Sequence, residues 1–318
     1  MNEKVLLEKL RRLEEKYAAS GQNLESYLDG LYEADFLNYW DYIHLDTLLS
    51  LQVKRSTLPD EEVFIVFHQI TELYFKLIIH ELEQLCLASP PDAELLENKL
   101  CRIIRYLNIL VKSFTVMSEG LDQGQFMRFR LALVPASGFQ SVQFRKIELM
   151  STSIKQLLHA GIREKHHALS PEEKTEGLYW RSGSTDLASG RKTLTLSRFE
   201  EKYNPLIRQW AEIFQDTNLN AHLEKNIWGN PIPEQLKDRL RQFDQLINIS
   251  WRSAHLQSAG RYLKSNAGVT EATGGTNWQR YLPPGFQKIL FFPSLWSEEE
   301  QQNWGHQILH RNPNDFTG

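Results

Sequence analysis

The sequence predicts an all-α fold, a large helical bundle, and three observations support this. Apolar residues recur at helical spacing through most of the 318-residue chain. Strand-like alternation is scarce, and no internal repeat of fixed period is present. The composition is 41% hydrophobic and 24% charged, which is typical of a globular chain that can bury a sizeable core.

Helical spacing predicts the elements of the first half. An amphipathic helix over residues 4–18 leaves an apolar stripe that needs a partner. From Asp60 to about Ala88 the chain is apolar around the whole helical circumference, which predicts a buried helix. After Pro90 and Pro91 a second long helix follows, so the two should form a hairpin. A third helix is expected after the break at residues 135–138, running through Ile154.

The second half is less regular. Residues 161–198 are polar and lack clean periodicity, and we interpret them as an excursion from the core. Helical spacing returns over residues 199–225 and 233–263. Residues 266–284 are rich in Gly, Thr, Asn and Pro, which predicts a mobile loop.

Charge and cysteine content exclude several classes of function. The net charge is −4, and 36 basic residues are dispersed among 40 acidic ones, so neither nucleic acid nor an anionic membrane is an expected partner. Cys86 and Cys101 lack CxxC spacing, which argues against a disulfide framework or a zinc site and fits a reducing compartment. The charged N-terminus does not resemble a signal peptide, and no run approaches membrane-spanning length. We therefore expect a cytoplasmic protein.

Common catalytic motifs are absent: the sequence has no HExxH, GxGxxG, P-loop or G-x-S-x-G. The first candidate for chemistry is therefore a lone histidine, His68, one helical turn after Phe64. An imidazole beside aromatic rings suits an apolar ligand with one polar edge. A hydrogen-bonded core histidine is the commoner use of such a residue, so His68 taken alone proves little.

A second candidate lies among apolar residues between Phe126 and Ser141. Arg130 is costly to bury there without a carboxylate, which either the protein or a ligand can supply, and an internal salt bridge is the commoner case. Ser137, before Gly138, can donate to an anion or cap the next helix.

Two further candidates lie near the C-terminal end. Trp251, His255, Ser258 and Tyr262 share one helical stripe, and an imidazole there can be an axial haem ligand or an ordinary packed histidine. Without a CxxCH motif such a haem would be bound non-covalently. Thr273, in a small flexible stretch, can fold over a ligand or belong to an ordinary turn.

Taken together, these segments resemble the tryptophan 2,3-dioxygenase family in order, identity and approximate spacing from about Tyr39 to about Leu295. The matching blocks are YWDYIHLDTLLSLQ from Tyr39, FIVFHQITELYFK from Phe64, FMRFRLALVPASGFQSVQFR from Phe126, WRSAH ending at His255, and TGGT from Thr273. The PASGFQSxQFR block is long and rarely met elsewhere, so it carries most of the assignment.

The resemblance implies a role for each candidate. His255 would be the proximal axial ligand of haem b, whose iron is ferrous in the active form, with Ser137 on the distal side near the haem. His68 would hydrogen-bond the indole N–H of the substrate, and Arg130 would clamp the substrate carboxylate. The remaining substrate contacts would come from the apolar wall, the loop threonine and a neighbouring subunit: Phe64, Phe126, Leu133, Thr273, Tyr39 and Tyr42.

The activity that the resemblance implies is the opening of the indole ring of L-tryptophan by O₂ to give N-formylkynurenine, the first step of the kynurenine pathway. The family is homotetrameric, a dimer of dimers with interlocked N-terminal segments. We therefore expect one domain over residues 1–318, with residues 1–38 as an oligomerisation arm. The alternatives are a haem monooxygenase of the same superfamily acting on a modified tryptophan, and a haem sensor or carrier without turnover.

The sequence departs from the family pattern in four places. Pro59-Asp60-Glu61 stands where His-Asp-Glu is frequent, and Tyr74 stands where tryptophan is common. After the paired glycines the chain reads Thr276-Asn277-Trp278 instead of Ser-Ser-Gly, and the stretch from His255 to Thr273 is longer than usual. The loop expected to close over substrate is thus the part that differs most.

Overall fold

The computed structural model describes residues 2–33, 38–87, 91–130, 140–185, 191–265, 268–269 and 284–305. It divides into two compact units, Met1–Val53 and Lys54–Gly318. The described residues are predominantly helical, with one short antiparallel pair, β1 (Lys264–Ser265) and β2 (Gly268–Val269). The predicted all-α class is confirmed, whereas the expectation of a single domain with an arm over residues 1–38 stays a prediction.

The N-terminal unit contains helices with no buried residue: α1 (Glu3–Ala19), α2 (Leu24–Glu33), α3 (Tyr39–Tyr42) and α4 (Leu45–Leu49). The amphipathic helix predicted over residues 4–18 is confirmed as α1. Tyr17 and Tyr27 join α1 to α2 through a ring contact of 4.4 Å between centroids. Large apolar side chains such as Leu31 and Trp40 remain exposed.

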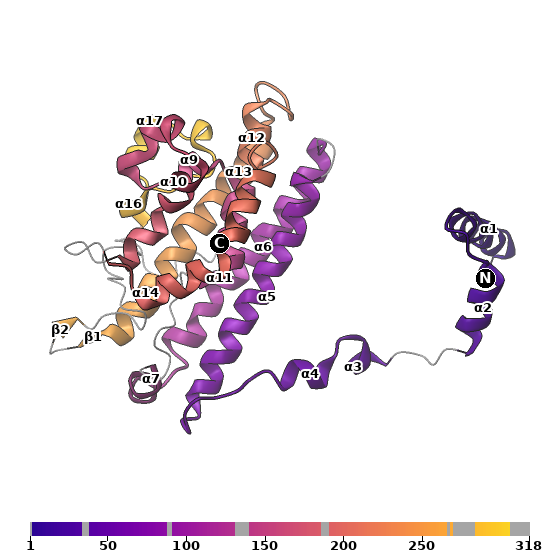
Figure 1. Ribbon diagram of the computed structural model, residues 1–318, viewed down its shortest axis with the longest axis horizontal. Coiled ribbons are helices and arrows are strands. Elements are labelled where there is room, and N and C mark those ends of the chain that lie inside the picture. Colours follow the sequence, from indigo (N-terminus) through magenta and orange to yellow (C-terminus); the bar gives the residue numbers. More distant parts are fainter. Residues whose placement is uncertain are drawn as a thin grey trace. The chain divides into compact units, whose positions relative to one another are not determined.

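The larger unit is built on a hairpin of two long helices, α5 (Asp60–Cys86) and α6 (Ala93–Ser118), which lie side by side (Figure 1). Asp92 caps α6 by accepting a hydrogen bond from the Leu95 backbone N–H at 2.7 Å. The predicted hairpin is confirmed.

The remaining elements of this unit surround the hairpin. The α-helices are α7 (Gln123–Phe129), α8 (Val142–Ser151), α9 (Ile154–Leu157), α10 (Pro171–Glu176), α11 (Leu194–Ile213), α12 (Leu219–Glu224), α13 (Glu234–Gln245), α14 (Trp251–Leu263), α16 (Pro284–Gln287) and α17 (Glu298–Gln302). Short 3₁₀ helices are η3 (Ala160–Ala168), η4 (Tyr179–Ser184) and η6 (Pro293–Leu295), and a π-helix, η5 (Leu246–Ser250), joins α13 to α14. The helices predicted over residues 199–225 and 233–263 are confirmed.

Helix α5 is buried on one face only. Ile78, Leu82 and Leu85 are fully buried in the core, but Ile70 and Leu77 are exposed. The expectation of burial around the whole circumference is therefore wrong for this unit, because its other helices cover one side of α5. Among the described helices, α5 alone has the length and hydropathy that a membrane span requires, and a core helix of a globular protein can have both.

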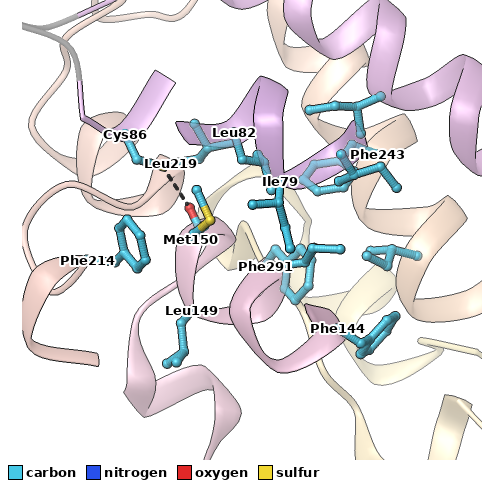
Figure 2. Close-up of a cluster of buried hydrophobic side chains, with 14 of the residues drawn as sticks. Ile79, Leu82, Cys86, Phe144, Leu149, Met150, Phe214, Leu219, Phe243 and Phe291 are labelled. Atoms are coloured by element: carbon cyan, nitrogen blue, oxygen red, sulfur yellow. Dashed lines mark hydrogen bonds between the residues drawn. The ribbon is translucent and has the colours of Figure 1, made fainter. Parts of the chain in front are cut away.

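The core lies where α8 packs on the hairpin, and Figure 2 shows part of it. Cys86 contacts the Met150 carbonyl oxygen at 3.4 Å, which joins the end of α5 to α8. Helix α8 ends at Ser151, earlier than the predicted run through Ile154. The physical reason is Thr152, whose backbone is extended and whose hydroxyl donates to the Phe291 carbonyl oxygen at 2.7 Å.

The polar segment 161–198 forms short helices, and the interpretation of it as an excursion from the core is wrong for the part around η4, which contributes to the core. Leu178, Tyr179 and Trp180 are buried there. Arg181 forms a buried ion pair with Glu200 of α11, which ties this segment to the rest of the unit. The loop predicted over residues 266–284 lies mostly outside the described residues.

Candidate functional site

The helix that carries His68 is held in place at its N-terminal end. The Asp122 backbone N–H donates to the Asp60 carboxylate at 2.6 Å, and the Asp60 backbone N–H donates to the side-chain oxygen of Gln125 at 3.2 Å. Glu61 is buried and accepts from the backbone N–H of Ser56 at 2.6 Å. These bonds fix the start of α5 against the start of α7.

Helix α14, which carries His255, also packs against α7. The Tyr262 hydroxyl donates to the Leu121 carbonyl oxygen at 3.1 Å and also contacts the Met117 carbonyl oxygen. The Tyr262 ring packs on Phe126 of α7 with centroids 5.0 Å apart. Helices α5, α7 and α14 therefore meet beside the C-terminal end of α6.

Apolar side chains fill this meeting point and form a cluster separate from the main core. Its buried members are Phe67, Phe114, Met117, Leu121, Phe129 and Tyr262, and its half-buried members include Phe64, Phe126 and Trp251. We call this set the aromatic cluster.

His68 lies at the edge of the aromatic cluster, where the residue is partly open to solvent and its ring packs against Phe64 and Phe67. Its Nδ1 atom is 2.7 Å from the Phe64 carbonyl oxygen. Because a carbonyl oxygen only accepts, this contact places the proton on Nδ1 and leaves Nε2 as an acceptor. Desolvation by surrounding protein lowers the pKa of His68, which favours the neutral ring. A neutral His68 can thus accept a hydrogen bond from a ligand N–H.

His255 lies on the other side of the aromatic cluster and is half-buried. Its ring stacks on Phe114 with centroids 5.9 Å apart. Burial, followed by the nearby charge of His68, lowers the pKa of His255 to about 4. The imidazole is therefore neutral near pH 7, which is the form that coordinates iron.

Two phenylalanines join the two histidines through ring contacts. Phe67 lies 5.4 Å from His68 and 5.6 Å from Phe114, measured between centroids, and Phe114 stacks on His255. The sequence does not assign Phe67 or Phe114 to the site, because an apolar residue at helical spacing has the same pattern whether it fills a core or lines a site.

Arg130 follows Phe129 directly at the C-terminal end of α7 and is 5% exposed. Burial lowers the pKa of its guanidinium. A buried guanidinium is stabilised by an anionic partner, and its planar fork matches a carboxylate. Phe126, one turn earlier, contacts Phe64 of α5 at 6.1 Å between centroids.

The structure thus brings five of the predicted site residues into one region of the larger unit: Phe64, His68, Phe126, Arg130 and His255. Tyr39 and Tyr42 belong to the N-terminal unit, where both are exposed. Leu133, Ser137 and Thr273 lie outside the described residues, so their roles stay predictions.

The donor chemistry at His255 fits a haem. Within the described ranges no group of three or more His, Cys, Asp or Glu side chains could hold a metal ion. An imidazole is a usual axial ligand of haem iron, whose other ligands come from the porphyrin. The neutral imidazole and the apolar rings around it suit that group.

Comparisons with known proteins agree with this chemistry. A family model described as tryptophan 2,3-dioxygenase matches residues 30–159, which include the positions of His68 and Arg130. Relatives of the same name are similar along most of the chain. The one from Herpetosiphon aurantiacus is 32% identical over 265 residues, covering 82% of this chain and 96% of the relative. Those from Exiguobacterium sibiricum and Ruegeria sp. are each 30% identical, over 290 and 275 residues, and cover 86% and 83% of this chain and 96% and 92% of the relatives.

Proposed function

This chain belongs to the tryptophan 2,3-dioxygenase family, and we propose that His68, Arg130 and His255 form the centre with which it performs the family's reaction. That reaction is the oxidative cleavage of the indole C2–C3 bond of L-tryptophan by O₂, which gives N-formylkynurenine. The observation that carries the proposal is the pair of neutral histidines on α5 and α14, joined through Phe67 and Phe114.

The family is haem-dependent, and we assign haem b to the His255 side of the aromatic cluster. The neutral imidazole of His255 would hold the haem iron, and Ser137 would contribute to the haem pocket. When bound, ferrous haem supplies the iron that activates O₂. The protein's part is to hold this group, orient the substrate and keep water away.

The substrate side of the site is supplied by residues of different chemistry. Arg130 would bind the carboxylate of L-tryptophan through its guanidinium fork. His68 would accept the indole N–H at Nε2, because its Nδ1 proton is already donated to the Phe64 carbonyl. Phe64 and Phe126 would pack against the ring. Together these contacts fix both ends of the amino acid.

We propose further substrate contacts from residues that lie outside the described part of the larger unit or in the N-terminal unit. Leu133 would complete the apolar wall, and Thr273 would contact the ammonium and carboxylate of the substrate. Tyr39 and Tyr42 would reach the site from a neighbouring subunit. Their exposure in the N-terminal unit, 71% and 74%, leaves both side chains accessible to a second chain.

We further propose a cytoplasmic homotetramer built as a dimer of dimers. The N-terminal helices α1–α4 contain no buried residue, although they carry many apolar side chains. Helix α5 exposes an apolar stripe of Val63, Ile70, Leu73 and Leu77. Exposed apolar surface of this extent is typical of an association interface.

The proposal is tested by following absorbance and product mass together. Haem-reconstituted protein is reduced without oxygen, then mixed with L-tryptophan and ¹⁸O₂. We expect N-formylkynurenine carrying both labelled atoms, and no product from His255→Ala. A singly labelled product would identify a monooxygenase, and a Soret band without product would identify a sensor or carrier.

A further inference from the structure

A buried polar network lies behind α14, centred on Tyr179 of η4. The Tyr179 hydroxyl donates to the Glu148 carboxylate at 2.5 Å and accepts from Arg145 at 3.3 Å and from Arg252 at 2.9 Å. One donated and two accepted bonds satisfy a hydroxyl completely. All four side chains are buried, so each loses solvent as an alternative partner.

The network continues along the chain into the π-helix that precedes α14. Arg252 also donates to the Asn248 side-chain oxygen at 3.1 Å, and Asn248 donates to Asp244 at 2.8 Å. Asp244 in turn accepts from the backbone N–H groups of Phe291 and Phe292 at 3.0 and 3.2 Å. A π-turn changes the helical register, so the direction of α14 depends on the contacts that hold η5.

Arg252 occupies a specific position relative to the proposed haem ligand. It precedes His255 by three residues on α14, which places the two side chains on neighbouring positions of the helix surface. The same turn is also held by packing, because the Trp251 ring contacts Phe114 at 4.7 Å and Phe75 at 5.5 Å between centroids. The hydrogen bonds of Arg252 and the ring contacts of Trp251 together fix the rotation of α14 about its own axis.

We infer that Tyr179 is a positioning residue for His255: through Arg252 it fixes the rotation of α14 and hence the direction of the imidazole. This gives a role to the polar segment 161–198, which composition alone leaves unexplained. The inference rests on the proposed function, because His255 must be the haem ligand for its direction to matter.

The chemistry of the network favours an orienting role for the hydroxyl. Burial raises the pKa of Tyr179, so the phenol keeps its proton and donates to Glu148. The rings also carry cation–π contacts, with the Arg252 guanidinium 5.0 Å from the Tyr179 centroid. Tyr179→Phe keeps these ring contacts and the packing. It removes the hydroxyl, and with it the hydrogen bond from Arg252 at 2.9 Å, the bond from Arg145 at 3.3 Å and the bond to Glu148 at 2.5 Å.

The test compares Tyr179→Phe with Tyr203→Phe in the full-length holoprotein. Tyr203 packs against the same core through a ring contact of 5.1 Å with Phe199, outside the network. Resonance Raman spectra of the ferrous proteins report the Fe–His stretching band, which depends on imidazole orientation. Transfer of haem to apomyoglobin reports its dissociation rate, and hydrogen exchange of residues 251–263 in the apoprotein reports the support of α14.

We expect Tyr179→Phe to shift the Fe–His band, to accelerate haem loss by about tenfold and to increase exchange in α14, whereas Tyr203→Phe matches the wild type. If Tyr179→Phe does not fold, Arg252→Lys, which keeps a charge but loses the guanidinium fork, should give the same three changes. An unchanged band with unchanged exchange in a folded variant would overturn the inference.

A separate variant distinguishes failure of this inference from failure of the proposed function. If the wild-type Fe–His band persists in His255→Gly, His255 is not the ligand and the proposed centre is wrong. If the band disappears in His255→Gly but is unaffected by Tyr179→Phe, only the positioning role is wrong.

Discussion

His255 stacks on Phe114, with ring centroids 5.9 Å apart and ring planes inclined by 22°. This contact brings α14 against the C-terminal part of α6 and removes the imidazole from water on one side. Burial, with a further contribution from His68, lowers the pKa of His255 from 6.5 to about 4. The stability of the protein should therefore depend on pH through this residue.

The direction of this pH dependence follows from the pKa of His255, which is lower in the folded chain than in the unfolded chain. Between pH 6.5 and pH 4 the unfolded chain binds a proton at this histidine and the folded apoprotein does not, so the free energy of unfolding falls as pH falls. We expect His255 to contribute about 2 kcal/mol of that loss between pH 6.5 and pH 4.5. Urea unfolding of the apoprotein at both pH values measures it.

His255→Gln should remove this part of the pH dependence because glutamine does not titrate. His80→Gln is the matched control, since His80 is exposed on α5 and should leave the wild-type slope intact. Equal slopes for the wild type and His255→Gln would show that the histidine titrates alike in the folded and unfolded chains.

His68 should act on the indole N–H of the substrate and on no other group of it. Replacing it in His68→Leu removes the acceptor Nε2, and we expect kcat/KM for L-tryptophan to fall by about tenfold. 1-Methyltryptophan has no indole N–H, so the same variant should change its kcat/KM little. Equal losses on both substrates would mean that His68 acts through packing or on another atom.

Arg130 should discriminate by the carboxylate of the substrate. In Arg130→Gln the guanidinium fork is lost, and we expect kcat/KM for L-tryptophan to fall by about 100-fold, chiefly in KM. Tryptamine lacks the carboxylate, so its slower turnover should be nearly unchanged. Arg128→Gln is the control, because Arg128 is exposed on the same helix. A fall of the same size with tryptamine would assign Arg130 a structural role instead.

Much of the fold could be predicted from periodicity, because long helices such as α5 and α6 repeat their apolar residues many times. Local chemistry decides the boundaries that were missed. Helix α8 stops where Thr152 bonds to Phe291, a residue 139 positions away, and no local pattern reveals such a partner. Likewise Tyr179 lies in a polar segment, and its burial depends on Glu148 and two arginines that fold around it.

The candidate site was predicted by a different route. A histidine on an apolar helix has the same local pattern in a core and in a site, so His68 and His255 were singled out by the order of family motifs rather than by spacing. The structure adds what the motifs lack, namely the tautomer of His68 fixed by the Phe64 carbonyl and the aromatic path through Phe114.

Asp244 should control the stability of the C-terminal segment that packs on α13. Its carboxylate accepts from the backbone N–H groups of Phe291 and Phe292 and from the Trp296 indole N–H at 3.1 Å. In Asp244→Asn an amide N–H₂ replaces one accepting oxygen and faces donors. We expect unfolding free energy to fall by about 2 kcal/mol, measured by urea denaturation, with faster hydrogen exchange in residues 288–305.

Asp244 also predicts a pH effect that opposes that of His255. Burial raises its pKa to about 6, so its contribution to stability is full below the unfolded value of 3.8 and is lost as pH rises through 6. This trend should disappear in Asp244→Asn. Asp238→Asn, at an exposed position of α13, should keep both the stability and the trend. Wild-type behaviour of Asp244→Asn would mean that the segment is held by its aromatic packing alone.

The exposed apolar stripe of α5 should be an interface between chains. Val63, Ile70 and Leu77 recur every seven residues, and Leu73 lies beside them. This is the pattern of a helix that packs along its length on another helix.

In the proposed homotetramer the wild type has a mass of four 37.1 kDa chains. We expect Leu73→Lys combined with Leu77→Lys to give smaller species in light scattering coupled to size-exclusion chromatography, because two charges cannot be desolvated there without partners. Lys76→Glu changes charge at an exposed position of the same helix and should keep the wild-type mass. A double variant that retains four chains would place the interface elsewhere, with the amphipathic helices of the N-terminal unit as the next surface to test.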